Sequence, residues 1–369
     1  MAEKTIRYGL IGAGMMGREH IRNLALIEGA EVVAVSDPDT AMRRQSRHLA
    51  GSGCRAFEDH RAMLDEVALD ALVIAAPNHL HAPIMADVLE TDLPILCEKP
   101  LGTTLAECRA IEARAAGRAA PVWVAMEYRY MPPVERLLKE VGAGTAGRVQ
   151  MVSVREHRFP FLRKVGDWNR FSEKSGGTLV EKCCHFFDLM RLILRSDPVC
   201  VYASGNMDVN HLEEKYGGRR PDVLDNAFVI VEFAGGARAV LDLCMFAEGS
   251  YWQEVISATG DRARLDACVP GPARFIPDGK ERVSRFVIAD RATRTERHEE
   301  IRVDDDILTA GDHHGSTFFQ HRKFIDMVRH GGAPEISVRD GLIAVAVGAA
   351  AEESARTGQP VSLKNLWEQ

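Results

Sequence analysis

The stretch Gly12-Ala13-Gly14-Met15-Met16-Gly17 decides the fold of the N-terminal part of this chain. It follows an apolar run that predicts a buried strand, Ile6 to Ile11, and it opens a predicted helix, Met15 to Ile27. In this context the first glycine permits a tight turn, the second lets a pyrophosphate approach the backbone, and the third allows close packing of helix on strand. The helix N-terminus presents free N–H groups to the phosphates. The stretch therefore predicts a dinucleotide-binding Rossmann domain.

An acidic residue at the right place supports this prediction. Asp37 follows the next predicted strand, Glu31 to Ser36, where a carboxylate binds ribose hydroxyls. Because a carboxylate there repels a 2′-phosphate, NAD is expected as the cofactor and NADP is less favoured. Further contacts are expected where later strands of the same sheet end. The expected cofactor contacts are Gly12, Gly14, Met15, Met16, Gly17, Asp37, Pro77, Asn78, His81, Glu98 and Lys99.

Two patterns of strands and helices divide the chain. Up to residue 126, apolar strands alternate with helices, which predicts a parallel, doubly wound sheet covered on both faces. Longer strands of alternating polarity then follow, at 149–157, 199–205, 227–233, 237–245 and 252–259. We therefore expect an α/β Rossmann domain over residues 1–126 and an α+β domain with a large, mainly antiparallel open sheet over residues 127–369. An exposed face of such a sheet favours a homodimer or homotetramer.

The composition excludes several classes of function. The chain has 369 residues, of which 46% are hydrophobic and 27% charged, as in soluble globular proteins. A net charge of −7 disfavours nucleic acid as a partner, and no apolar tract has the length that a membrane span requires. The N-terminus lacks a signal-peptide pattern, so a cytoplasmic location is expected. The eight cysteines show no Cys-x-x-Cys spacing, which favours reduced thiols over a disulfide framework.

A carboxylate and an imidazole lie four residues apart in a segment that predicts a buried helix. Glu181 and His185 at this spacing project from one helix face. Alcohol oxidation requires a base for the hydroxyl proton, and histidine titrates near neutrality. Lys99 follows a predicted strand at the same sheet edge as the dinucleotide, where a lysine in a partly dry site can titrate near neutrality and share the proton transfer. Lys99, Glu181 and His185 are the candidate catalytic residues.

Taken together, these motifs resemble the glucose–fructose oxidoreductase/inositol dehydrogenase (Gfo/Idh/MocA) family over nearly the whole chain. The resemblance rests on the glycine stretch, Asp37, Ala76-Pro77-Asn78-His79, Glu98-Lys99-Pro100, Gly176-Gly177-Thr178-Leu179, His185-Phe186-Phe187-Asp188 and the C-terminal run from Gly341 to Val361. It implies that Lys99, Glu181 and His185 form the catalytic group and that the enzyme uses no metal.

Two positions depart from the family pattern. The acid is usually aspartate but here is Glu181, and the small residue between acid and histidine is Cys183, with Cys184 beside it. These departures indicate a particular subgroup of the family. A zinc site formed by these cysteines with neighbouring histidines is disfavoured, because the helical spacing does not give a closed tetrahedral set.

A loop that mixes cations with aromatic residues, residues 155–170, precedes the catalytic segment. Trp168 is suited to stacking on a sugar ring, and Arg163, Lys164 or Arg170 to holding a carboxylate, sulfonate or phosphate. A solvated loop with paired charges is the alternative. A second loop, at 311–316, is expected to complete the pocket. The expected substrate contacts are Tyr128, Arg158, Arg163, Lys164, Trp168, Asn169, Arg170, His313 and His314.

Three functions remain open from the sequence. The leading one is NAD-dependent hydride transfer at a secondary alcohol of a sugar or cyclitol. The alternative is an NAD-dependent glycoside hydrolase for an acidic sugar glycoside such as a sulfoquinovoside, acting through transient oxidation, elimination, water addition and re-reduction. The third is a non-catalytic, NAD-sensing regulator, against which the presence of Lys99, Glu181 and His185 argues.

Overall fold

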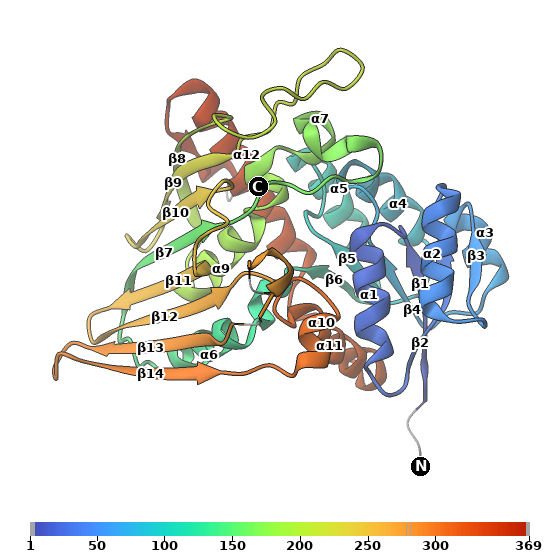
Figure 1. Cartoon of the computed structure of the whole chain (residues 1–369), viewed down its shortest axis with the longest axis horizontal. Helices are drawn as coiled ribbons and strands as arrows, with labels where there is room; N and C mark the ends of the chain where they lie inside the picture. The colour runs from blue at the N-terminus through green and yellow to red at the C-terminus, as the bar shows by residue number, and fades with distance from the viewer. Residues whose placement is uncertain (1–3, 278, 281, 367–369) are drawn as a thin grey trace.

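A parallel six-stranded sheet forms the N-terminal part of the protein, as the computed structural model shows for the described residues 4–277, 279–280 and 282–366 (Figure 1). Its strand order is β3-β2-β1-β4-β5-β6, so the order reverses between β1 and β4. The strands are β1 (Ile6–Ile11), β2 (Ala30–Ser36), β3 (Arg55–Phe57), β4 (Ala71–Ile74), β5 (Ile95–Glu98) and β6 (Val122–Ala125). The helices that connect them are α1 (Met15–Ala25), α2 (Thr40–Ala50), α3 (His60–Glu66), α4 (His81–Val88) and α5 (Leu105–Ala115). The predicted Rossmann fold is confirmed.

A nine-stranded sheet forms the second part of the protein, in the order β14-β13-β12-β11-β7-β10-β9-β8-β15. Only β7 and β10 pair in parallel, so the sheet is mixed but mainly antiparallel, as predicted. The strands are β7 (Val149–His157), β8 (Pro198–Asn206), β9 (Asn226–Phe233), β10 (Arg238–Cys244), β11 (Trp252–Gly260), β12 (Ala263–Pro270), β13 (Ser284–Asp290), β14 (Thr295–Ile301) and β15 (Val361–Ser362).

Helices cover one face of the large sheet and connect it to the Rossmann sheet. Helix α12 contacts both β8 and α5, while α11 packs on α1. The helices of this part are α6 (Pro132–Gly142), α7 (Ser172–Ser175), α8 (Thr178–Glu181), α9 (Cys184–Leu194), α10 (Asp305–Thr309), α11 (Ser316–His330) and α12 (Val338–Thr357), with short 3-10 turns such as η2 (Glu127–Tyr130) and η3 (Val165–Arg170). One continuous apolar core therefore includes residues from Ile6 to Leu366.

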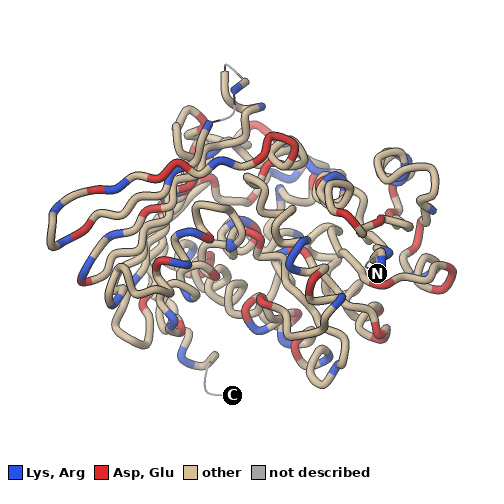
Figure 2. The backbone as a smooth tube through the Cα atoms, turned by 90° about the horizontal axis from the view of Figure 1, so that it is seen from below, with Lys and Arg blue, Asp and Glu red and all other residues tan. Residues whose placement is uncertain are grey.

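The opposite face of the large sheet is open. It exposes apolar side chains that include Tyr202, Phe228 and Ile230, which lie on the adjacent strands β8 and β9. Charged residues of both signs are spread over several strands of this sheet (Figure 2). Among the described residues, no helix combines the length and apolar character that a membrane span requires.

Candidate active site

A cavity of about 720 Å³ lies where strands β1, β2, β4 and β5 end, beside the reversal of strand order. In open α/β sheets, this is where ligands bind. Most of the expected cofactor contacts line the cavity, and residues of the 155–170 loop close it from the other side. The lining includes Gly12, Gly14, Met15, Met16, Asp37, Pro77, Asn78, Glu98, Lys99, Arg163, Lys164 and Trp168.

The glycine loop fits a dinucleotide. Gly12 has a φ of +94°, and a Cβ there would lie 2.5 Å from the backbone nitrogen of Ala76. A Cβ on Gly17 would lie 2.1 Å from the carbonyl oxygen of Gly12, so this glycine is needed for packing rather than for lining the cavity. A Cβ on Gly14 would meet no atom within 4 Å, which leaves its backbone open to a phosphate.

Asp37 and His81 support the walls of the cavity. The Asp37 carboxylate accepts the backbone N–H groups of Ala13 and Asp39, each at 2.8 Å, and so fixes the glycine loop at the place where a ribose would bind. His81 is fully buried, outside the cavity lining, with its ring nitrogens 2.7 Å from the Pro100 oxygen and 3.0 Å from the Ala76 oxygen. His81 therefore connects the loops that contain Ala76 and Pro100, on the side away from the cavity.

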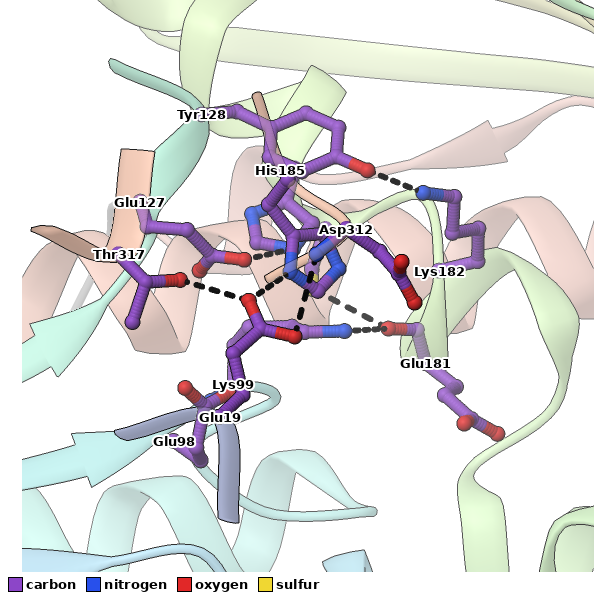
Figure 3. A network of polar contacts seen from close by, with 12 residues as sticks. Glu19, Glu98, Lys99, Glu127, Tyr128, Glu181, Lys182, His185, Asp312 and Thr317 are labelled. Atoms are coloured by element: carbon purple, nitrogen blue, oxygen red, sulfur yellow. Dashed lines mark hydrogen bonds and ion pairs between the residues drawn. The ribbon is translucent and has the colours of Figure 1, made fainter. Parts of the chain in front are cut away.

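The expected helix face that carries both Glu181 and His185 does not exist, and this prediction is wrong. Helix α8 ends at Glu181, the chain turns at Lys182 and Cys183, and α9 begins at Cys184. The Glu181 carboxylate points away from His185 and is 2.9 Å from Lys164 Nζ, while the Glu181 carbonyl accepts a hydrogen bond of 3.2 Å from Lys99 Nζ (Figure 3). At this turn the Lys182 side chain makes buried polar contacts. The spacing of apolar residues in the sequence does not reveal such contacts, so it did not predict the turn.

His185 is held between an aromatic ring and a carboxylate. Its ring stacks on Tyr128, with centroids 4.1 Å apart and planes 5° from parallel, and its Nε2 atom is 3.7 Å from Glu127 Oε1. Burial, together with the charges of Lys99 and Lys182, lowers the pKa of His185 well below 6.5. The imidazole is therefore neutral and able to accept a proton at neutral pH.

Sequence reasoning missed Glu127, which lies two residues after the end of β6 and whose only signal is that position at the sheet edge. Its side chain is buried, and neither carboxylate oxygen has a hydrogen-bond partner among the described residues. Burial, with repulsion from Glu98, raises the pKa of Glu127 to about 7. A carboxyl group that titrates at neutral pH therefore lies beside the candidate base.

Lys99 stays charged, contrary to the expectation that it titrates near neutrality. Burial acts to lower its pKa, but electrostatic interactions with the acidic groups of Cys184, Glu127 and Glu98 outweigh burial and raise the pKa. Burial instead lowers the pKa of a second lysine, Lys182, which sequence reasoning also missed. Its Nζ atom donates to Tyr128 Oη at 2.5 Å (Figure 3). Lys99 is therefore suited to act as a charged hydrogen-bond donor, and Lys182 as a group that exchanges a proton.

The loop at 311–316 reaches the site through an ion pair with α1. His313 Nδ1 is 2.7 Å from Glu19 Oε1, which also accepts the Thr317 hydroxyl at 3.0 Å. Burial opposes the charge on His313, but Glu19 outweighs it and raises the pKa of His313 to about 9. His314 next to it is buried, which lowers its pKa to about 4. His313 therefore brings a positive charge to the site, whereas His314 is neutral.

The 155–170 loop divides into residues that face the cavity and residues that hold the loop. Lys164 Nζ lies 4.4 Å from the centroid of the Trp168 ring, and both residues line the cavity with Arg163. In contrast, the Asn169 amide donates to the Leu162 oxygen at 3.0 Å. The buried Arg170 pairs with Glu214 at 2.8 Å and also binds the Phe161 oxygen. Asn169 and Arg170 are thus occupied within the protein framework.

The fold and the site define a two-domain oxidoreductase whose N-terminal domain binds NAD. Residues 6–126 match the profile described as "Oxidoreductase family, NAD-binding Rossmann fold", and residues 139–363 match "Oxidoreductase family, C-terminal alpha/beta domain". The chain belongs to the Gfo/Idh/MocA family of oxidoreductases. The resemblance and the NAD cofactor predicted from sequence are confirmed. Among the described residues, no group of three or more histidine, cysteine, aspartate or glutamate side chains is placed to hold a metal ion.

Relatives and solved structures agree with this membership. The chain is 28% identical to the rhizopine catabolism protein MocA of Rhizobium meliloti, covering 77% of this chain and 86% of that protein. It is 24% identical to the myo-inositol 2-dehydrogenase of Thermotoga maritima, covering 98% and 99% of the two chains. An oxidoreductase domain protein from Kribbella flavida shares the fold with a TM-score of 0.81, 24% identity and coverage of 98% and 99%. So does a levoglucosan dehydrogenase solved with NADH and levoglucosan, with a TM-score of 0.80, 20% identity and coverage of 97% and 99%.

Proposed function

We propose that this protein oxidises a secondary alcohol of a sugar or cyclitol with NAD, by a mechanism in which His185 is the base. The observation that carries the proposal is the neutral, buried His185 between Tyr128 and Glu127, close to the charged Lys99 that lines the cofactor cavity. The inositol dehydrogenases among the relatives support an alcohol of this class.

The residues of the chain have distinct tasks in this reaction. NAD⁺, held by Gly12, Gly14 and Asp37, would supply the acceptor for the hydride of the alcohol carbon. The Lys99 ammonium donates a hydrogen bond to the reacting oxygen, and neutral His185 takes the hydroxyl proton. The imidazolium that results is stabilised by the Glu127 carboxylate, 3.7 Å away. Oxidation of one alcohol thus delivers one proton to the His185–Glu127 pair.

Cofactor and substrate contacts follow from which side chains face the cavity. We assign the ribose to Asp37, the phosphates to Gly12 and Gly14, and a sugar face to Trp168. Tyr128, Arg158, Lys164 and His313 are the remaining candidates for substrate hydroxyls. Because Lys164 is paired with Glu181 and Arg163 with Asp167, a neutral polyol is favoured over an acidic sugar. The other expected contacts are assigned to holding the protein structure in place rather than to binding a ligand: Asn169, Arg170, His81 and His314.

The glycoside hydrolase remains the second candidate, and the lysine of lowered pKa favours it. Redox-neutral cleavage needs a proton-transfer group besides the base for the hydroxyl, and Lys182 is available for this task. The third candidate, an NAD-sensing regulator, binds the cofactor but turns over no sugar. An oligomer formed through the open sheet face is supported by the exposed Tyr202, Phe228 and Ile230.

A substrate panel distinguishes the three candidates. The protein is incubated with NAD⁺ and with myo-inositol, levoglucosan, glucose, glucuronate and their methyl glycosides where these exist. NADH is followed by absorbance and released sugar by chromatography. NADH formed in step with the ketone supports the dehydrogenase, whereas sugar released without net NADH supports the hydrolase. Cofactor binding without either product supports the regulator.

A further inference from the structure

Lys182 occupies the turn between α8 and α9, directly after the residue whose carbonyl binds Lys99. It is 5% exposed, yet it is held by polar groups from two other elements. Its Nζ atom is 2.5 Å from Tyr128 Oη on η2 and 2.8 Å from Glu156 Oε1 on β7. This placement makes Lys182 a built part of the site rather than a surface lysine.

The two contacts match the hydrogen-bonding capacity of a neutral amine. An ammonium group has three donors, and loss of one proton leaves two N–H groups and a lone pair. Tyr128 Oη and Glu156 Oε1 provide two acceptors for those N–H groups. The lone pair is then the remaining position on Nζ, at which the amine can accept a proton. Burial, with the charges of Arg158 and Lys99, lowers the pKa of Lys182 against the opposing effect of Glu156 and Glu254, and so favours this neutral form.

A pair of buried carboxyl groups lies behind Lys182. Glu156 on β7 and Glu254 on β11 face each other directly across the two strands. Both are at most 1% exposed, and Oε2 of each has no hydrogen-bond partner among the described residues. Burial and the charge of Glu156 raise the pKa of Glu254 to about 7. The pair therefore places an acidic environment, with a carboxyl group that takes up a proton near neutral pH, close to the amine.

The amine lies one ring stack away from the first base. Tyr128, which binds Lys182 through Oη, stacks face to face on His185 with centroids 4.1 Å apart. Tyr128 therefore places Lys182 beside the base that takes the hydroxyl proton in the proposed function. Alcohol oxidation needs one base, and His185 supplies it. A second buried group that can accept a proton, the Lys182 amine, therefore indicates a second proton transfer.

We propose that Lys182 is a second base, which removes a proton from the carbon next to the carbonyl of the oxidised substrate, with Tyr128 as its positioning residue. The inference rests on the proposed function, since only a carbonyl makes the neighbouring C–H acidic. Lysine serves as the base for such carbon acids in the enolase superfamily.

The step balances in protons and electrons. The Lys182 lone pair takes the proton, the C–H electron pair forms a carbon–carbon double bond, and the carbonyl oxygen becomes an enolate oxygen that Lys99 stabilises by hydrogen bonding. Return of a proton from Lys182 to carbon restores the ketone. Alternatively, the enolate re-forms the carbonyl and its carbon–carbon double bond shifts to the next carbon. The oxygen substituent on that carbon then leaves with the electron pair of its bond and takes the proton from the Lys182 ammonium, which gives an unsaturated ketone and an alcohol or water. No oxidant or reductant is consumed in either case.

The experiment uses a ketone directly, so that no hydride has to move. The full-length protein, saturated with NAD⁺, is mixed in D₂O with 2-keto-myo-inositol or with 3-keto-glucose, and deuterium at the carbons next to the carbonyl is followed by NMR. We expect exchange at least about tenfold faster than in buffer. Exchange is expected to fall as pH is lowered, because the Lys182 amine becomes protonated among Glu156, Glu254, Arg158, Tyr128 and Lys99.

Variants assign the exchange to the amine. Lys182→Met is expected to reduce it to the buffer rate, and Tyr128→Phe, which keeps the ring stack, to reduce it and shift its pH dependence. The matched control Lys139→Met removes an exposed lysine on α6, outside the site, and is expected to retain exchange. Exchange equal to the buffer rate, or unchanged in Lys182→Met, overturns the inference. Consumption of NADH with the same ketones is measured separately and reports on the proposed function: NADH oxidation without exchange refutes the second base alone, and absence of both refutes the dehydrogenase as well.

Discussion

Substitution of Glu19 by glutamine should destabilise the protein in a way that depends on pH. Glu19 on α1 pairs with His313 in the loop before α11, and so joins the Rossmann part to the loop at the site. Raising the pKa of His313 from 6.5 to about 9 corresponds to about 3 kcal/mol of preference for the charged form in the folded state. Burial raises the pKa of Glu19, but His313 outweighs it, and the net result is a pKa lowered from 4.5 to about 2. Both shifts describe one interaction, so their free energies are not added.

The pH window follows from the direction of each shift. Because the pKa of His313 is raised, its contribution is complete below pH 6.5 and is lost as pH rises through about 9. Because the pKa of Glu19 is lowered, its contribution is complete above pH 4.5 and is lost as pH falls towards 2. The ion pair therefore stabilises the fold fully between pH 4.5 and pH 6.5.

Thermal unfolding at pH 5.5 and at pH 10 measures how much the Glu19–His313 ion pair contributes to stability at each pH. At pH 5.5, Glu19→Gln is expected to lose about 3 kcal/mol, which lowers Tm by roughly 5 °C. At pH 10 the native imidazole is neutral, so only altered hydrogen bonds remain, worth about 1 kcal/mol. The control is Asp312→Asn, which breaks an exposed pair with Arg274 and is expected to change Tm little at either pH. An equal loss of Tm at pH 5.5 and pH 10 in Glu19→Gln would refute the reasoning.

Four further outcomes are expected. Asp37→Ser should weaken NAD about tenfold or more, about 1.4 kcal/mol, and reduce discrimination against NADP, as KM values for both cofactors will show. Gly17→Ala should abolish NADH binding, measured by fluorescence, because its Cβ would lie 2.1 Å from the Gly12 oxygen. His185→Asn should lower kcat about 100-fold while NADH still binds, and near-normal turnover would contradict its role as base. Glu127→Gln should remove an ionisation near pH 7 from the kcat profile, since the wild-type carboxylate that stabilises the imidazolium forms as pH rises through that value.

The fold was predictable where local pattern and burial agree. Apolar runs such as β1 and β4 are buried on both faces of a parallel sheet, so they are continuous and easily detected. Strand β14 was not predicted, because its sequence Thr295–Ile301 is charged and almost wholly exposed, and only its pairing with β13 makes it a strand. The boundary expected at residues 126/127 and the cytoplasmic location stay predictions.

The candidate site was predictable only in part. Lys99 and His185 were found because motif and strand end mark them. Glu127 is marked only by its position after β6, and Lys182 and Glu254 carry no local signal. The spacing of four residues predicted that Glu181 and His185 project from one helix face. This prediction is wrong because a turn separates α8 from α9.

By itself, the sequence determined the Rossmann fold, the NAD site and the two central catalytic candidates. Glycines at a strand–helix junction and an acid after the next strand act over short distances along the chain, where spacing dictates geometry. Only the tertiary structure decided which carboxyl groups and lysines share the site. Glu156 meets Glu254 across two strands, and Tyr128 joins Lys182 to His185 by a hydrogen bond and a ring stack. Their protonation depends on burial and on neighbours distant in sequence, and these arise only when strands and helices that are far apart along the chain come together.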